Sequence, residues 1–270
     1  MSRKFSLRTK VFAAAAGTLA LLATLVPAAT GAEESFRGPK PTVVLVHGAF
    51  ADASSWTDVV ERLQRNGFPV IAAPNELRGT HHDAEVVRGL LDSVKGPVVL
   101  VGHSYGGTVI SEAAAGDKDV KALVYIAAFA PEVGESSGQL AGKFPGGKLG
   151  PDTTTVVTTP GGTDTYIKPE AYREVFAADL TRTQIAVGAA SQRPIAGSAL
   201  GEASTAAAWK EIPSWYLVAR QDNAIPAAAQ RFMAERAHAH TTEVNASHSV
   251  AVSRPDATAS TIVAAARATR

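Results

Sequence analysis

The chain has 270 residues, with 26 lysine and arginine residues against 25 aspartate and glutamate residues, and it contains no cysteine. This near balance of charge lacks the basic surplus of a nucleic-acid-binding protein, and a chain without cysteine has neither disulfides nor thiolate metal sites. The length is sufficient for one sizeable α/β domain with its own core.

The first 32 residues have the pattern of a secretory signal peptide. Their basic start contains four cations: Arg3, Lys4, Arg8 and Lys10. An apolar stretch at 11–26 follows, and residues 30–32 (Thr-Gly-Ala) are small enough for a cleavage site. A permanent membrane anchor is the alternative, but the stretch is shorter than the roughly 20 apolar residues that a span needs.

We therefore expect a secreted protein, cleaved near Ala32, with no stable membrane anchor after cleavage. The removed segment carries four of the 26 basic residues and none of the 25 acidic ones, so the mature chain has a formal net charge of −3. Export of a chain without cysteine is compatible with a bacterial source.

Strand and helix patterns alternate along the first half of the remaining chain. Runs of β-branched and apolar residues at 42–46 and 70–73 predict strands buried on both faces of a parallel sheet. Helical patterns at 55–66 and 83–95 follow them, and Gly67 is placed to end the first helix. This spacing is typical of βαβ units.

The most informative motif follows the third predicted strand, 98–101. The string Gly102-His103-Ser104-Tyr105-Gly106-Gly107 lies between that strand and a predicted helix at 108–115. A serine at such a turn forms a nucleophile elbow, with flanking glycines because a Cβ there would collide with the strand and the helix. The Tyr105 N–H lies at the helix N-terminus, where it would face a developing oxyanion. The alternative is a glycine-rich turn with an uninvolved serine.

After a fourth predicted strand at 122–128, the alternation fails between about 131 and 205. Pro-Gly-Gly strings punctuate this segment, residues 153–155 suit extended or loop chain, and helical stretches occur near 169–180 and 183–190. A long excursion that leaves a sheet and returns to it is typical of a lid. The last elements are strands at 214–219 and 241–245 and helices at 226–237 and from Pro255 onward.

A nucleophilic serine needs a histidine base oriented by a carboxylate. Among the seven histidines, His248 directly follows the last strand, at the sheet edge where the elbow opens. His103 is inside the elbow and would point away from the Ser104 hydroxyl. His47 lies at the end of the first predicted strand, where backbone groups rather than an imidazole ring are needed. A solvated loop histidine is the alternative for His248.

Asp222 follows the strand at 214–219 and shares the same edge, so it is the candidate orienting carboxylate. It could instead form a turn with Asn223. Asp52 and Asp83 are interpreted more simply as helix N-caps. Aromatic residues that could line a pocket, or equally belong to the core, are Phe50, Tyr105, Phe129 and Phe144.

Four blocks and His248 together resemble the α/β-hydrolase superfamily, in particular the small-lid branch of bacterial serine esterases related to plant hydroxynitrile lyases and methylesterases. These blocks are 43–56, 99–107, 122–131 and 214–226. The resemblance covers nearly all of residues 33–270. It implies a mainly parallel sheet of about six strands flanked by helices, with a small lid inserted after the fourth strand at about 131–205.

The resemblance also implies roles for individual residues. Ser104 would be the nucleophile, His248 the general base and acid, and Asp222 the group that fixes the imidazole tautomer. The backbone N–H groups of Ala49 and Tyr105 would form the oxyanion hole. No metal and no organic cofactor are expected.

The resulting expectation is an exported serine carboxylesterase that cleaves small or medium carboxylic esters or lactones through an acyl-enzyme. One alternative is a lyase that uses the same triad as a base. Related lyases carry a threonine near the oxyanion strand and a lysine beside the catalytic histidine, where this chain has Gly48 and Ser249. The other is a catalytically inert binding protein on this scaffold. The sequence identifies neither the acyl and alcohol groups nor the oligomeric state.

Overall fold

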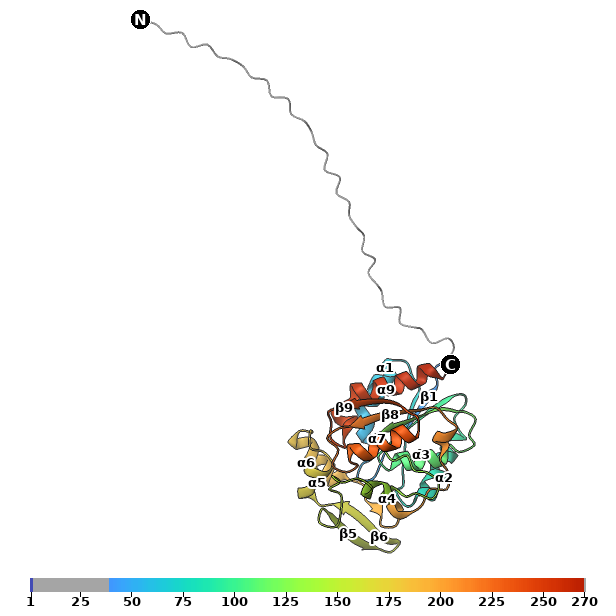
Figure 1. Cartoon of the computed structure of the whole chain (residues 1–270), viewed down its shortest axis with the longest axis vertical. Coiled ribbons are helices and arrows are strands. Elements are labelled where there is room, and N and C mark those ends of the chain that lie inside the picture. Colours follow the sequence, from blue (N-terminus) through green and yellow to red (C-terminus); the bar gives the residue numbers. More distant parts are fainter. Residues whose placement is uncertain (2–38, 270) are drawn as a thin grey trace. The chain divides into compact units, whose positions relative to one another are not determined.

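The computed structural model describes Met1 and residues 39–269 (Figure 1). The predicted signal peptide, Met1 apart, lies outside the described residues and stays a prediction. Within the described part of the chain, no helix has the length and apolar character needed to cross a membrane. The same part contains no group of three histidine or carboxylate side chains placed to hold a metal ion.

The centre of the fold is a six-stranded parallel sheet. Its strands are β1 (Thr42–Val46), β2 (Val70–Ala73), β3 (Val98–His103), β4 (Val120–Ile126), β8 (Ser214–Ala219) and β9 (His240–Val244). They lie in the order β2-β1-β3-β4-β8-β9, and every neighbouring pair is parallel. The predicted fold class is therefore confirmed, and the carboxyl ends of all six strands meet at one edge.

Helices cover both faces of this sheet. They are η1 (Ala53–Trp56), α1 (Thr57–Arg65), α2 (Thr80–Leu91), α3 (Gly106–Ala113), α7 (Ala227–Arg236), α8 (Val250–Ser253) and α9 (Pro255–Ala268). Because side chains alternate along a strand, β1 supplies two separate cores. Val44 packs in the core beneath α2, α3 and α7, whereas Val43 packs in the one beneath α1 and α9.

An insertion occupies residues 127–213, between β4 and β8. Its elements are α4 (Ser137–Gly142), β5 (Thr154–Thr159), β6 (Gly162–Ile167), α5 (Pro169–Val175), α6 (Arg182–Ser191), β7 (Ile195–Ala196), η2 (Ala199–Gly201) and η3 (Ala208–Lys210). The expectation of an insertion after the fourth strand is thus confirmed. Strands β5, β6 and β7 form a small antiparallel sheet, which the sequence did not predict, since β5 is exposed along most of its length and has no apolar alternation.

One predicted helix start was wrong. Helix α2 begins at Thr80 with Gly79 as its N-cap, so Asp83 is not the capping residue. Because the first turn of α2 is polar, the apolar periodicity of the sequence does not indicate where this helix begins. Asp83 is buried and accepts hydrogen bonds from the backbone N–H groups of Arg78 (3.1 Å) and Gly79 (3.4 Å). Asp52 does cap η1, where its carboxylate accepts from the Ser54 N–H at 2.7 Å.

Candidate active site

Ser104 occupies a strained turn between β3 and α3. Its φ of 55° lies in the left-handed region, which is costly for a residue with a side chain. A Cβ on Gly102 would lie 2.5 Å from the Gly106 carbonyl oxygen, and one on Gly106 would lie 2.5 Å from the Val46 carbonyl oxygen. These contacts explain the glycines of the motif, since no other residue allows so close a turn.

The loop after β1 lies directly against Ser104. A Cβ on Gly48 would approach the Ser104 Cβ to 2.6 Å and its Oγ to 3.1 Å, so only glycine fits there. Ala49 and Tyr105 are both buried, and in the described part of the chain their backbone N–H groups donate to no other protein group. Buried N–H groups without a partner are rare, which favours a role in binding an external acceptor.

The His47 ring holds this loop in place. The Asn75 N–H donates to His47 Nε2 at 3.2 Å, so the proton of the neutral ring is on Nδ1, which donates to the Gly48 carbonyl at 2.9 Å. Burial lowers the pKa of His47 and keeps the ring neutral. From the sequence, only the backbone at His47 was expected to matter. The role of its ring in holding the loop was not predicted.

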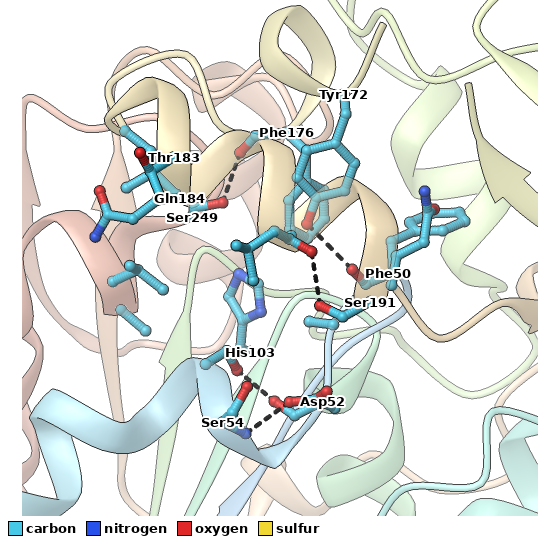
Figure 2. A pocket seen from close by; sticks show the side chains of 18 residues that line it. Phe50, Asp52, Ser54, His103, Tyr172, Phe176, Thr183, Gln184, Ser191 and Ser249 are labelled. Carbon is cyan, nitrogen blue, oxygen red and sulfur yellow. Dashed lines mark hydrogen bonds between the residues drawn. The ribbon is translucent and has the colours of Figure 1, made fainter. Parts of the chain in front are cut away.

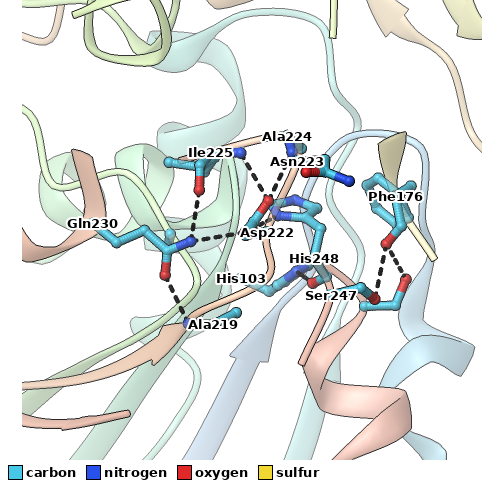
Figure 3. A network of polar contacts seen from close by, with 12 residues as sticks. His103, Phe176, Ala219, Asp222, Asn223, Ala224, Ile225, Gln230, Ser247 and His248 are labelled. Carbon is cyan, nitrogen blue, oxygen red and sulfur yellow. Dashed lines mark hydrogen bonds and ion pairs between the residues drawn. The ribbon is translucent and has the colours of Figure 1, made fainter. Parts of the chain in front are cut away.

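Figure 3 shows the side chains of His248 and Asp222 paired with each other. His248 Nδ1 lies 2.7 Å from Asp222 Oδ2, and both side chains are buried. The other carboxylate oxygen, Oδ1, accepts from the backbone N–H groups of Ala224 (2.7 Å) and Ile225 (2.8 Å). The carboxylate is therefore held in one orientation, and His248 presents its Nε2 as the ring nitrogen free to take a proton.

Gln230 completes the hold on Asp222. Its amide nitrogen donates to Asp222 Oδ2 and to the Ile225 carbonyl, both at 2.8 Å, and its oxygen accepts from the Ala219 N–H at 3.0 Å. Gln230 is fully buried on the inner face of α7. The sequence signal for this role is a single glutamine among the alanines and Met233 of that face.

His103 buttresses the candidate base. Its Nε2 lies 2.9 Å from the His248 carbonyl oxygen and donates to it, and the two rings are 4.8 Å apart. Burial and the neighbouring His248 lower the pKa of His103 to about 3, so it stays neutral. The structure therefore links the residue before Ser104 directly to the histidine loop.

The insertion also contacts this loop, as Figure 3 shows. The Phe176 carbonyl accepts from the Ser249 N–H at 3.0 Å and from the Ser249 hydroxyl at 2.9 Å. The Phe176 ring packs against the His248 ring with 4.8 Å between centroids. A residue just beyond the end of α5 thus fixes the position of the candidate base.

The side chain of Tyr105 is anchored below the elbow. Its hydroxyl donates to the buried Asp83 carboxylate at 2.8 Å. Burial raises the pKa of Asp83, while the hydrogen bonds from the Arg78 N–H, Tyr105 and the Gly79 N–H oppose that rise. Asp83 therefore anchors the side chain of the residue whose N–H is predicted to form part of the oxyanion hole.

The predicted site residues converge on one edge of the sheet. Ser104, the loop with Ala49, Asp222 and His248 follow β3, β1, β8 and β9 respectively. The candidate pocket aromatics do not converge: Phe50 lines a cavity, whereas Tyr105 and Phe129 are buried in the core and Phe144 packs on Phe232.

Sequence comparisons identify relatives over most of the chain. A model of the alpha/beta hydrolase family matches residues 43–261. The alpha/beta hydrolase nvfD of Aspergillus novofumigatus is 30% identical over 220 residues, which cover 73% of this chain and 84% of that protein. A pyrethroid hydrolase of Sphingobium wenxiniae is 29% identical over 220 residues, covering 71% and 74% of the two chains. A carbendazim hydrolyzing esterase of Nocardioides sp. is 34% identical over 108 residues, covering 34% and 44%.

Solved structures share the fold at lower sequence identity. Polyneuridine aldehyde esterase superposes with a TM-score of 0.72 at 18% identity, covering 83% of this chain and 98% of that one. A methylesterase from Arabidopsis gives 0.67 at 21% identity, covering 83% and 98%. With the six-stranded parallel sheet and the serine elbow after its third strand, the family match over 43–261 shows that the chain belongs to the alpha/beta hydrolase family.

Proposed function

We propose that this protein is a serine carboxylesterase that cleaves small or medium carboxylic esters or lactones through an acyl-enzyme. The observation that carries the proposal is the buried His248–Asp222 pair, 2.7 Å apart, at the sheet edge that also presents Ser104. The names of two relatives, a pyrethroid hydrolase and a carbendazim hydrolyzing esterase, support hydrolysis of a small molecule.

In the proposed reaction, His248 Nε2 takes the proton of the Ser104 hydroxyl as Oγ attacks the ester carbonyl carbon. The carbonyl oxygen becomes an oxyanion that accepts from the Ala49 and Tyr105 N–H groups. Removing one such donor typically costs about 3 kcal/mol of transition-state stabilisation. The carbon–oxygen bond then breaks, and His248 returns the proton to the leaving alcohol. A water molecule, deprotonated by His248, hydrolyses the acyl-enzyme and restores Ser104.

Asp222 acts through the imidazole in this scheme. Its Oδ2 accepts the Nδ1 proton, which keeps Nε2 free as the base and stabilises the imidazolium that forms. Because Asp222 Oδ1 is already bound by two backbone N–H groups, the carboxylate cannot turn away. A lyase reaction is disfavoured because Ser249, in place of a lysine beside the base, has its hydroxyl tied to the Phe176 carbonyl.

Localisation and domain organisation form part of the same proposal. Residues 1–32 act as a cleaved signal peptide for secretion, and residues 33–270 form the hydrolase domain. Residues 131–205 act as a lid over its site. The basic start and the short apolar stretch at 11–26 support the first point.

The test is hydrolysis of p-nitrophenyl esters from acetate to palmitate by the protein and by its Ser104→Ala variant. We expect activity that falls with acyl length and a variant reduced to a small residual rate. Labelling by an alkyl phosphonate fluoride should occur in the protein and not in the variant. A fully active Ser104→Ala protein would refute the mechanism.

A further inference from the structure

A cavity of about 310 Å³ lies beside the catalytic pair, between the insertion and the core (Figure 2). Lid-side helices α5 and α6 contribute Tyr172 and Val187, and Phe176 follows directly after α5. The core contributes Phe50, which comes just after the Ala49 loop, and His103, which precedes Ser104. We name this space the side chamber.

Two side chains that line the side chamber also contact the His248 ring. Phe176 faces the chamber and also packs on the His248 ring, 4.8 Å away between centroids. His103, whose ring also lies 4.8 Å from that of His248, forms another part of the wall. Phe176 and His103 therefore each contact both the chamber and the His248 ring, whereas Ser104, Asp222 and His248 are not among the residues that line it.

The chemistry of the walls selects an uncharged occupant. Among the residues that line the chamber, Asp52 is the one with a formal charge at neutral pH, and its carboxylate already caps η1 through the Ser54 N–H. His103 is neutral because burial and His248 lower its pKa to about 3. The rings of Phe50, Tyr172 and Phe176 pack edge-on or tilted, with centroids 5.3–6.3 Å apart, and form an aromatic wall. Nothing there would balance the charge of a carboxylate or phosphate.

Helix α6 covers the chamber and packs on the main core through the partly buried Ile185 and Ala189. None of its ten residues is buried, although five of the residues after Gln184 are alanine or β-branched, and Val187 is 60% exposed on the chamber side. A capping box between Thr181 and Gln184 closes its first turn. An apolar group in the chamber would cover Val187 and complete the packing of this helix.

We propose that the side chamber binds an uncharged, ring-sized apolar group of the ester substrate. This group belongs to the acyl or the alcohol part and is remote from the bond that is cleaved. This inference rests on the proposed esterase function. The chamber volume of about 310 Å³ is at the lower end of the roughly 300–1,000 Å³ found for small-molecule pockets, which suits one or two rings. The substrate class is therefore neutral esters with an aromatic or cyclic group.

The test fills the chamber from α6. Val187→Trp places a large side chain at the chamber wall, and Ala186→Trp is its matched control, because Ala186 lies on the same helix but lines a different groove. Ser191→Phe and Ala190→Phe repeat the comparison one turn later, since Ser191 lines the chamber and Ala190 lines the other groove. Circular dichroism checks that all four variants are folded.

The substrates are ethyl acetate, benzyl acetate and ethyl phenylacetate, so that a ring is offered on either side of the ester. For Val187→Trp and Ser191→Phe we expect kcat/KM on at least one ring-bearing ester to fall about tenfold or more, with ethyl acetate changed less than about twofold. The control variants should behave as the unmodified protein. Equal losses on all three esters, or equal losses in the controls, would overturn the proposal.

A binding measurement separates this inference from the proposed function. Benzyl alcohol should raise the melting temperature of the Ser104→Ala protein, which has lost its proposed nucleophile, and this shift should disappear when Val187→Trp is added. A shift without any ester hydrolysis by the unmodified protein would reject the esterase and leave a ligand-binding chamber. Absence of the shift would reject the chamber while the esterase stands.

Discussion

Gln230 gives the sharpest test of how the candidate base is held. In Gln230→Leu, a side chain of similar size replaces one that makes three hydrogen bonds inside the protein, at 2.8–3.0 Å. Asp222 loses one donor, and the Ala219 N–H and the Ile225 carbonyl lose their partner. Each buried group left unsatisfied costs about 1–3 kcal/mol, so we expect a loss of about 3 kcal/mol in the free energy of unfolding.

The assay is urea denaturation followed by circular dichroism, with ester hydrolysis measured on the folded variant. Because Asp222 Oδ1 keeps its two backbone donors, we expect kcat to fall while the enzyme retains activity above that of a His248→Ala variant. Gln64→Leu, on the exposed face of α1, is the matched control and should change neither quantity. A Gln230→Leu protein with unchanged stability and unchanged kcat would refute the reasoning.

Three further predictions concern other parts of the molecule. Tyr105→Phe removes the hydroxyl that donates to Asp83 and leaves that carboxylate short of a donor, so unfolding free energy should fall by about 1–3 kcal/mol in denaturant titrations, and an unchanged value would contradict the account. The hydrogen bond that His81 Nδ1 donates to the Glu112 carboxylate raises the pKa of His81 above 6.5, so its stabilisation is complete below pH 6.5 and is lost as pH rises through the folded-state pKa. The melting temperature of the unmodified protein should therefore fall as pH rises across that range, and that of His81→Gln should fall less steeply. Parallel curves for the two proteins would count against the contact. Finally, N-terminal sequencing of protein recovered from the culture medium should begin near Glu33, whereas an intact N-terminus would reject the signal peptide.

The sequence predicted the elements that depend on strong local patterns. Most strands of the central sheet were found because they are runs of apolar or β-branched residues, although β9 also contains His240 and Glu243, and the elbow was found because its glycines are required by close backbone contacts. Ser104, Asp222 and His248 could be selected because residues that follow parallel strands share one edge of the sheet. Their roles remain predictions until activity is measured.

The parts that the sequence did not predict depend on contacts between distant segments. Gln230 and Asp222 are eight residues apart, but nothing in their spacing shows that α7 turns its glutamine inward to the carboxylate. The His103 hydrogen bond to the His248 carbonyl joins residues 145 positions apart. The hairpin of β5 and β6 is stabilised by pairing rather than burial, so periodicity could not find it.

The insertion fixes both loops that the proposed reaction needs. Phe50, which follows Ala49, has a φ of 60°, and its strained backbone is bound on both sides by the insertion. Its N–H donates to the Arg193 carbonyl at 3.0 Å, and its carbonyl accepts from the Tyr172 hydroxyl at 3.3 Å. On the other side, the Phe176 carbonyl holds the loop of His248. A displacement of α5 would therefore disturb the loop of Ala49 and the loop of His248 together, so the geometry of both groups in the proposed reaction depends on the position of this helix.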